Sequence, residues 1–393
     1  MALPNSSDLA TLDTAYQAGP FCWVEAKSLS TQTLDYSYQA QPFVAAASAG
    51  AAGAYSLSAA AGAFTLAGQA AGLLVSHVLI ASSGSIAVTG GDATFSRGYP
   101  VSAGAGSFTI TGQPTTALRS KRLTAATGAF TIAGQAAALL ATHKLLASAG
   151  SCTLIGNAAG LQSTRLIVGG IGSFTFTGQP AALLASRRLI AATGAFTIAG
   201  QSATFLRSYV TPASAGSFTL SGNSAGFLGQ RYLSAASGSF TSTGVASTAR
   251  LDRRLLASPG AVAVVGQDAA LLAPRRLPAA AGSFTLTGQS AILQRAVPLI
   301  ATAGSFAYIG QSAALQRTVR LVASTASITC TGQSIDLLVG RYMTGDAAVF
   351  SLAGSTAALQ AGRKLHSASA SFTITGQQAY FSAVYVRRRI VIF

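Results

Sequence analysis

The chain has 393 residues, of which half are hydrophobic and only 9% are charged, and its formal net charge is +16. Ordinary soluble domains have about 25% charged residues, so this surface must be rich in Ser, Thr and Gln or be covered by other chains. No segment supplies the roughly 18 consecutive apolar residues of a membrane helix, so no membrane span is expected. The composition therefore favours a protein that works within an assembly.

Residues 1–45 differ from the rest of the chain. They contain its only tryptophan and a net charge of −3, against +19 for the remainder. They lack a basic stretch followed by an apolar one, so we expect no secretory signal and synthesis in a cytoplasm. We predict an N-terminal attachment or assembly region, with these candidate contact residues: Phe21, Trp23, Tyr36, Tyr38 and Phe43.

A 22-residue repeat runs without insertion or deletion from residue 64 to residue 372, after a degenerate half-repeat within residues 46–60. The residue that marks each copy, called here the Phe position, is Phe in most copies, as at Phe64, Phe108 and Phe372. A fixed period of this length is typical of architectures in which each unit buries its apolar face against its neighbours. Residues 46–385 are therefore predicted to form about fifteen repeated units.

Each copy has the pattern of two strands. Phe130 and Ile132 alternate with Thr131 and Ala133, which predicts a half-buried strand. A glycine follows four residues after the Phe position in all fifteen copies, usually before Gln. It predicts a turn and a backbone conformation that is costly for a Cβ, such as positive φ. A longer strand, with a bend near its middle, is expected after that turn.

The sequence thus predicts an all-β fold, a β-solenoid-like stack of strand–turn–strand units in which identical side chains form ladders. An antiparallel β-meander or a fibrous β trimer remains the alternative. Residues 386–393, VRRRIVIF, are predicted to be a C-terminal cap or a strand that pairs with another chain.

Two of the three cysteines occupy positions of the repeat that are filled by apolar residues in other copies. Cys152 stands at the Phe position, and Cys330 stands two residues after Ile328. We expect both to be buried thiols that replace apolar side chains, with no disulfide between them and no metal or redox role.

Positive charge recurs thirteen or fourteen residues after the Phe position. At the ~4.8 Å spacing of neighbouring strands these charges repel one another, so an anionic surface or glycan, or an acidic subunit, is a candidate partner. The plain alternative is a solvated edge that blocks sideways aggregation. Since no aromatic residues are seen to interleave the arginines, nucleic acid is not expected as a partner. The candidate residues are Arg165, Arg187, Arg188, Arg231, Arg253, Arg254, Arg275, Arg276, Arg341 and Arg363.

No pattern of catalytic residues stands out from the repeat. The Gly-Gln and Gly-Ser pairs are typical of turns, and no spacing of His, Cys or acidic residues indicates a nucleophile, a metal site or a phosphate-binding loop. We expect no enzyme activity, no cofactor and no metal.

The repeat AxxGxFTxxGQxAxLxxxRxL, and the segment Leu34–Ala46 before it, resemble structural proteins of tailed bacteriophages, especially fibre-like and tail-associated ones. The resemblance implies a virion component made in the host cytoplasm, a fibre or shaft that self-associates as a homo-oligomer and contacts other virion proteins. The alternative is a subunit of a bacterial extracellular β-rich filament.

Overall fold

The computed structural model describes residues 22–26, 33–38, 43–47, 50–59, 63–140, 144–257, 259–272, 277–294, 299–361, 364–367, 371–383, 386–387 and 391–392. The chain divides into two compact units, Met1–Ala181 and Ala182–Phe393, and each is described by itself.

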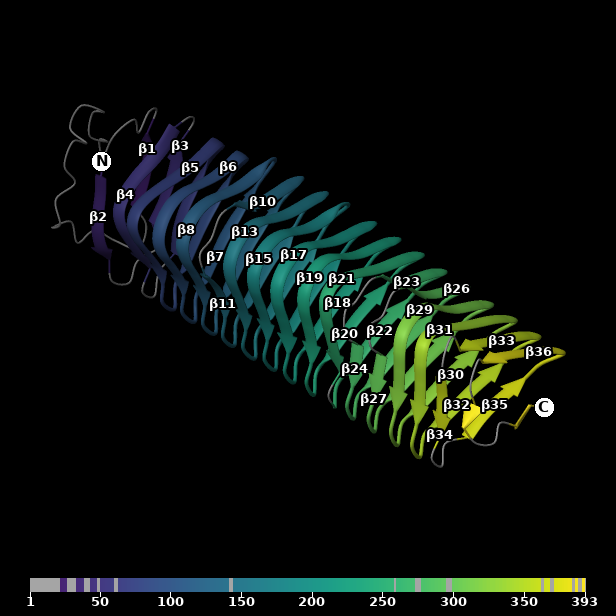
Figure 1. The fold of residues 1–393 in the computed structure, drawn as a ribbon. Coiled ribbons are helices and arrows are strands. Elements are labelled where there is room, and N and C mark those ends of the chain that lie inside the picture. The colour runs from purple at the N-terminus through teal and green to yellow at the C-terminus, as the bar shows by residue number, and fades with distance from the viewer. Residues whose placement is uncertain are drawn as a thin grey trace. The chain divides into compact units, whose positions relative to one another are not determined.

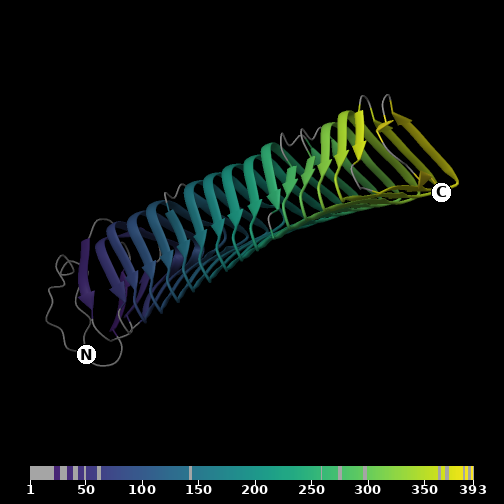
Figure 2. The same cartoon turned by 60° about the horizontal axis from the view of Figure 1, so that its bottom comes forward.

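Both units are parallel β-solenoids, as predicted. The coil of Phe130 shows the plan, with three strands in succession: β9 (Ala129–Gly134), β10 (Ala136–Leu140) and β11 (Lys144–Ala147). Each strand pairs in parallel with its counterpart in the neighbouring coil, so that Cys152 lies opposite Phe130 and Leu161 opposite Leu139. Every register given for the described strands is parallel, which decides against the antiparallel alternative. Figures 1 and 2 show these strands side by side within each unit.

In unit 1, the two strands β5 (Ala63–Ala81) and β6 (Ser85–Ala103) each run through a whole coil. From there on the first strand of each coil is separate, and the second and third are often continuous. The remaining repeat strands are β7 (Ser107–Gly112), β8 (Thr115–Ala125), β12 (Ser151–Ile155), β13 (Ala158–Gly169) and β14 (Ser173–Thr177).

Four strands precede the regular repeat in unit 1. They are β1 (Cys22–Ala26), β2 (Thr33–Tyr38), β3 (Phe43–Ala47) and β4 (Gly50–Ala59). β1 pairs with β3, and β3 pairs with β5, so that Cys22 lies opposite Phe43 and Phe43 lies opposite Phe64. The parallel arrangement thus extends N-terminally, with a period one position shorter than that of the repeat.

The coils of unit 2 have the same three-strand plan. The strand β15 (Ala181–Ala191) lies in unit 2 except for its first residue. The first strands of the coils are β16 (Ala195–Ala199), β18 (Ser217–Ser221), β20 (Ser239–Thr243), β22 (Ala261–Val265), β25 (Ser283–Thr287), β28 (Ser305–Ile309), β30 (Ser327–Thr331), β32 (Val349–Ala353) and β35 (Ser371–Thr375).

The second and third strands of unit 2 complete each coil. They are β17 (Ser202–Ala213), β19 (Ser224–Ala235), β21 (Ala246–Ala257), β23 (Asp268–Leu272), β24 (Leu277–Ala279), β26 (Ser290–Gln294), β27 (Leu299–Ala301), β29 (Ser312–Ala323), β31 (Ser334–Gly345), β33 (Thr356–Ala361), β34 (Lys364–Ser367) and β36 (Gln378–Ala383). At the C-terminal end, β37 (Val386–Arg387) pairs with β34 and β38 (Val391–Ile392) pairs with β35.

The core of each coil consists of the inward residues of its three strands. Alternation places one residue in two inside, so the burial pattern follows the pattern of apolar residues in the sequence. In the coil of Phe130 the buried side chains are Phe130, Ile132, Ala137, Leu139, Leu145 and Ala147.

Aromatic rings at the Phe position stack from coil to coil. The ring centroids of Phe108 and Phe130 are 5.0 Å apart with an interplanar angle of 9°, and those of Phe196 and Phe218 are 4.9 Å apart at 6°. Burial of one such side chain stabilises the fold by about 2 kcal/mol, and an aromatic contact adds roughly 0.5–1.5 kcal/mol. The Phe ladder is therefore a main source of cohesion between coils.

The glycine four residues after the Phe position has a different cause from the predicted one. Its φ is not positive in any described copy; a Cβ there would instead strike the preceding coil. A Cβ on Gly112 would lie 2.7 Å from the carbonyl oxygen of Gly90, and one on Gly178 would lie 2.6 Å from that of Gly156. A Cβ is therefore costly at this position, as predicted, but the suggested positive φ was wrong: close approach between coils, and not the turn itself, requires glycine.

The bend predicted within the long strand is present where the second strand passes into the third. The register of β19 against β21 shifts after Leu228, and Gly229 has a φ of 72°, the only positive-φ glycine among the described residues. The register of β29 against β31 shifts between Leu315 and Thr318. A local irregularity thus turns the strand at this corner.

Replacing Gly134 by alanine is expected to destabilise unit 1 by about 2 kcal/mol, because the added methyl group overpacks against the Gly112 carbonyl. Gly160→Ala is the matched control, since a Cβ there meets nothing within 4 Å and its coil neighbour is Ala138. Gly160→Ala should leave the urea midpoint unchanged or raise it slightly. Equal losses for both variants would contradict the proposed contact.

Removing the hydroxyl of Tyr308 is expected to stabilise unit 2. This side chain is 1% exposed, and its oxygen has no hydrogen-bond partner within the described structure. Tyr308→Phe should therefore raise the free energy of unfolding by about 1 kcal/mol, measured by urea unfolding, because a buried unpaired hydroxyl is costly. Tyr342→Phe, at a ring that is 39% exposed, should have no effect. A destabilised Tyr308→Phe would reveal a partner for the hydroxyl.

Candidate functional site

The positive charge of the repeats is confined to one part of each coil. All Lys and Arg residues between residues 60 and 385 lie ten to fourteen positions after a Phe position, a stretch called here the cationic edge. In the coil of Phe130 this stretch runs from Leu140, at the end of β10, to Lys144, at the start of β11. The cationic edge therefore follows the corner between the second and third strands.

The described Lys and Arg side chains of the cationic edge are exposed to solvent. In unit 1, Lys144 pairs directly with Arg122 in the neighbouring coil. A spacing of ~4.8 Å lies well within the Debye length of ~8–10 Å, so such neighbours repel. The exposed members with described side chains are Arg122, Lys144 and Arg165 in unit 1, and Arg187, Arg188, Arg250 and Arg320 in unit 2.

The ten arginines predicted from the sequence fall into three groups. Arg165, Arg187 and Arg188 are exposed. Another four lie within strands whose pairing is described: Arg231, Arg253, Arg254 and Arg341. The remaining three, Arg275, Arg276 and Arg363, lie outside the described residues. Their role as contacts for an anionic partner stays a prediction.

One tyrosine does stand between two cations, contrary to the prediction, and a second stands between a valine, Val210, and a cation. Tyr342 lies between Arg320 and Lys364 in the ladder of the third strand, and Tyr232 lies opposite Arg254. The two rings are 39% and 38% exposed. The prediction failed because it followed the arginines alone; tracing the fourteenth position through every copy would have found both tyrosines.

Most acidic residues of the repeats lie outside the cationic edge. Asp92 and Asp268 lie six positions after a Phe position and Asp336 lies eight after, so all three belong to the second strand, where each is exposed. Asp346 follows the third strand, directly after β31. Asp252 is the exception and lies within the cationic edge. Since most copies carry a cation there, one acid does not neutralise the positive charge of the edge.

The first strand of the coil is uncharged. From one residue before to three residues after the Phe position, no copy contains Asp, Glu, Lys or Arg. The outward residues are mostly Ser, Thr and Ala, as at Ser107, Thr109 and Thr111. We call this surface the neutral side.

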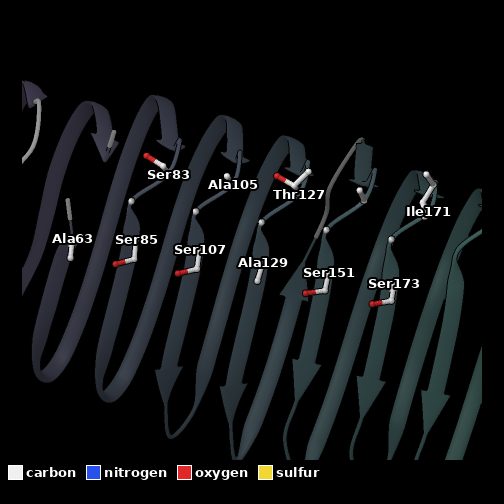
Figure 3. A pocket seen from close by; sticks show the side chains of 16 residues that line it. Ala63, Ser83, Ser85, Ala105, Ser107, Thr127, Ala129, Ser151, Ile171 and Ser173 are labelled. Carbon is white, nitrogen blue, oxygen red and sulfur yellow. The ribbon is translucent and has the colours of Figure 1, made fainter. Parts of the chain in front are cut away.

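A shallow groove borders the neutral side in unit 1. It has a volume of about 920 Å³ and follows the glycine turn that leads into each first strand. Figure 3 shows Ser85, Ser107, Ser151 and Ser173 in a row along it, with Thr127 and Ile171 on the turns. In unit 2 two grooves of about 370 Å³ and 340 Å³ occupy the same position in the coil, at Ser217 and at Ser283.

Most aromatic residues proposed for N-terminal attachment lie in the early strands. Trp23 is in β1, Tyr36 and Tyr38 are in β2, and Phe43 is in β3. Phe21 lies outside the described residues. Their role in attachment stays a prediction.

The two cysteines of the repeats are buried thiols, as predicted. Cys152 is 3% exposed and Cys330 is 2% exposed, and both are free. Burial raises the pKa of each thiol to about 12, because it penalises the charged thiolate. Across the described residues, no three His, Cys, Asp or Glu side chains are grouped so as to hold a metal ion.

Comparison with protein-family models, with curated proteins and with solved structures gave no match to this chain. In the part of the chain that the structure describes, no helix is long and apolar enough to cross a membrane.

Cys152 and Cys330 are expected to resist alkylation in the folded protein at pH 8 and to react fully after unfolding, because protonated, buried thiols are poor nucleophiles. Peptide mass spectrometry after iodoacetamide treatment resolves each site. Since the folded pKa lies above the unfolded value of about 8.5, the stability from these thiols is present below that pH and falls as pH rises toward 12. Rapid labelling of the folded protein would contradict their burial.

Proposed function

We propose that this chain is a non-enzymatic structural component of a tailed-bacteriophage virion. Its coils would form a fibre or shaft that self-associates or docks on the particle. The class of particle comes from the resemblance of the repeat to tail-associated virion proteins, and the contact surface comes from the arrangement of charge on the coil.

The neutral side is the observation that carries this proposal. Covering a charged side chain costs desolvation energy, whereas a surface of Ser, Thr and Ala can be covered at a much lower cost. The uncharged first strand recurs in every copy, and the same groove borders it in each unit. A second chain or a particle surface with the same period therefore has a repeated, uncharged surface to contact.

Regularity supports a mechanical role. The first strands are five or six residues long through most of the repeats, and neighbouring coils share one register from Ser217 opposite Ser239 to Val349 opposite Ser371. Because neighbouring coils are held by backbone hydrogen bonds, and in part of the stack by contacts between aromatic rings, such a body is suited to carry load over a distance.

Association with the particle is tested on lysates of cells that carry the gene. The chain is expected to co-sediment with particles in a density gradient and to be located on them by immunogold labelling. Deleting the gene should remove the labelled structure from the particles. Polymerisation of the purified chain into long fibres, without particles, would instead support the extracellular filament.

The contact surface is tested by adding charge. Thr331→Lys places a cation at an exposed position of the neutral side, in β30, and should reduce self-association or docking severalfold because of its desolvation cost. Gln360→Lys adds the same charge at an exposed position in β33, ten positions after Phe350 and therefore within the cationic edge, and serves as the matched control away from the neutral side. Sedimentation velocity and particle co-sedimentation measure both variants. Equal effects would argue against the neutral side as the contact.

A further inference from the structure

Tyrosines stand within the cationic edge in places where other coils have a cation. The strand registers put Tyr342 one coil from Arg320 and one coil from Lys364, and Tyr232 one coil from Arg254. All five residues belong to unit 2. This surface thus offers an aromatic ring next to a cation, at the ~4.8 Å spacing of parallel strands, at two places along the edge.

The two rings are positioned for stacking. Tyr232 and Tyr342 are 38% and 39% exposed, so part of each ring packs against the protein and part is open to a ligand. Of the three cations that pair with these tyrosines, two are arginines, Arg254 and Arg320. Arginine also predominates elsewhere along the edge of unit 2, as at the exposed Arg187 and Arg188. A guanidinium group forms paired hydrogen bonds with carboxylate or sulfate oxygens, and a lysine ammonium does not.

We propose that the cationic edge binds a linear acidic polysaccharide, with one uronate or sulfate group on each sugar or each second sugar. Arginines bind the acid groups, and Tyr232 and Tyr342 stack on the apolar faces of sugar rings. The polymer lies along the edge, because the distance from coil to coil is close to the length of one sugar residue in an extended chain. This binding does not depend on the proposed virion role, since it concerns the chain itself.

The spacing favours a polysaccharide over nucleic acid. Duplex DNA presents one charge per about 1.7 Å of its axis, much denser than one coil per ~4.8 Å. Proteins that bind single strands stack successive bases on aromatic side chains. Here Tyr232 and Tyr342 are five coils apart, or about 24 Å, with cations between them. A polymer that is charged at regular intervals and stacked only occasionally fits this pattern better.

The test uses the full chain and three probes: polygalacturonate, neutral dextran and an oligo-dT strand. Isothermal titration calorimetry is expected to show binding of polygalacturonate, at least tenfold weaker binding of oligo-dT, and none of dextran. Binding of polygalacturonate should weaken steeply as salt rises, because the contact releases counterions. Preference for oligo-dT would overturn the proposal in favour of nucleic acid, and failure to bind polygalacturonate would overturn it altogether.

Variants separate the two parts of the site. The double variant Tyr232→Ala/Tyr342→Ala should weaken polygalacturonate binding about tenfold with little change in its salt dependence. Tyr380→Ala is the control, because Tyr380 is 56% exposed but lies on the second strand, in β36. Arg320→Gln should weaken binding and reduce its salt dependence, whereas Arg320→Lys should keep the salt dependence.

Each variant result bears on the proposal. Wild-type affinity in the double tyrosine variant, or equal loss in Tyr380→Ala, would contradict the role of the two rings. Unchanged salt dependence in Arg320→Gln would contradict the ionic contact. Particle association is measured separately, so a particle-bound chain that ignores polygalacturonate overturns this inference and leaves the proposed function standing.

Discussion

Parallel hydrogen bonding between coils holds the residues of the repeat strands opposite their counterparts in the next copy, except at the irregular corner, and the rest of the structure follows from this constraint. The amide of Ser151 donates to the carbonyl of Gly128 at 3.1 Å, and that of Ala158 donates to Gln135 at 2.9 Å. At a strand spacing of ~4.8 Å, each side chain meets its own counterpart in the next coil. A residue therefore stabilises the stack only if its side chain can pack next to a similar side chain in the neighbouring coil.

The same spacing between coils is favourable at some positions of the repeat and unfavourable at others. It lets Phe108 and Phe130 stack, and it leaves no room for a Cβ on Gly112 or Gly178. It also sets Arg122 beside Lys144, where like charges repel. The phenylalanines and glycines of the described coils fit against their own counterparts, whereas the paired cations Arg122 and Lys144 repel each other. Along the neutral side no like charges repel one another, and covering this surface with another protein costs little desolvation energy.

Much of the fold could be predicted because apolar and polar residues alternate along the sequence of each strand. Phe130 and Ile132 proved to be buried as expected, and Cys152 and Cys330 proved to be core residues. The cause of the recurring glycine could not be inferred, since a turn with positive φ and a close approach between coils demand the same residue. The strands within residues 22–47 escaped notice because their period is one position shorter than that of the repeat.

Of the candidate site, the arginines could be predicted from the sequence, but the two tyrosines were not predicted. The arginines could be recognised because the same residue type recurs at one position of the repeat. Tyr232 and Tyr342 occupy that position in their own copies, but they were missed because their side chains are aromatic and not cationic. The strand pairing was needed to place them: Arg320 pairs with Tyr342, and Tyr342 pairs with Lys364, so the ring and the two charges form one line. Residues one repeat apart in the sequence become neighbours in space only once the parallel coil is established.

The uniform register also has a consequence for how such a gene can change. Each repeat meets its neighbours through like positions, as Ser217 meets Ser239 and Ser283 meets Ser305. Loss or duplication of one whole copy by recombination between repeats would create a junction of the same kind as those already present. The length of the repeat region can therefore evolve in steps of about 4.8 Å, without a new interface at each step. An insertion shorter than a full copy would break the ladders on either side of it, so inheritance is expected to preserve the period more strictly than the number of copies.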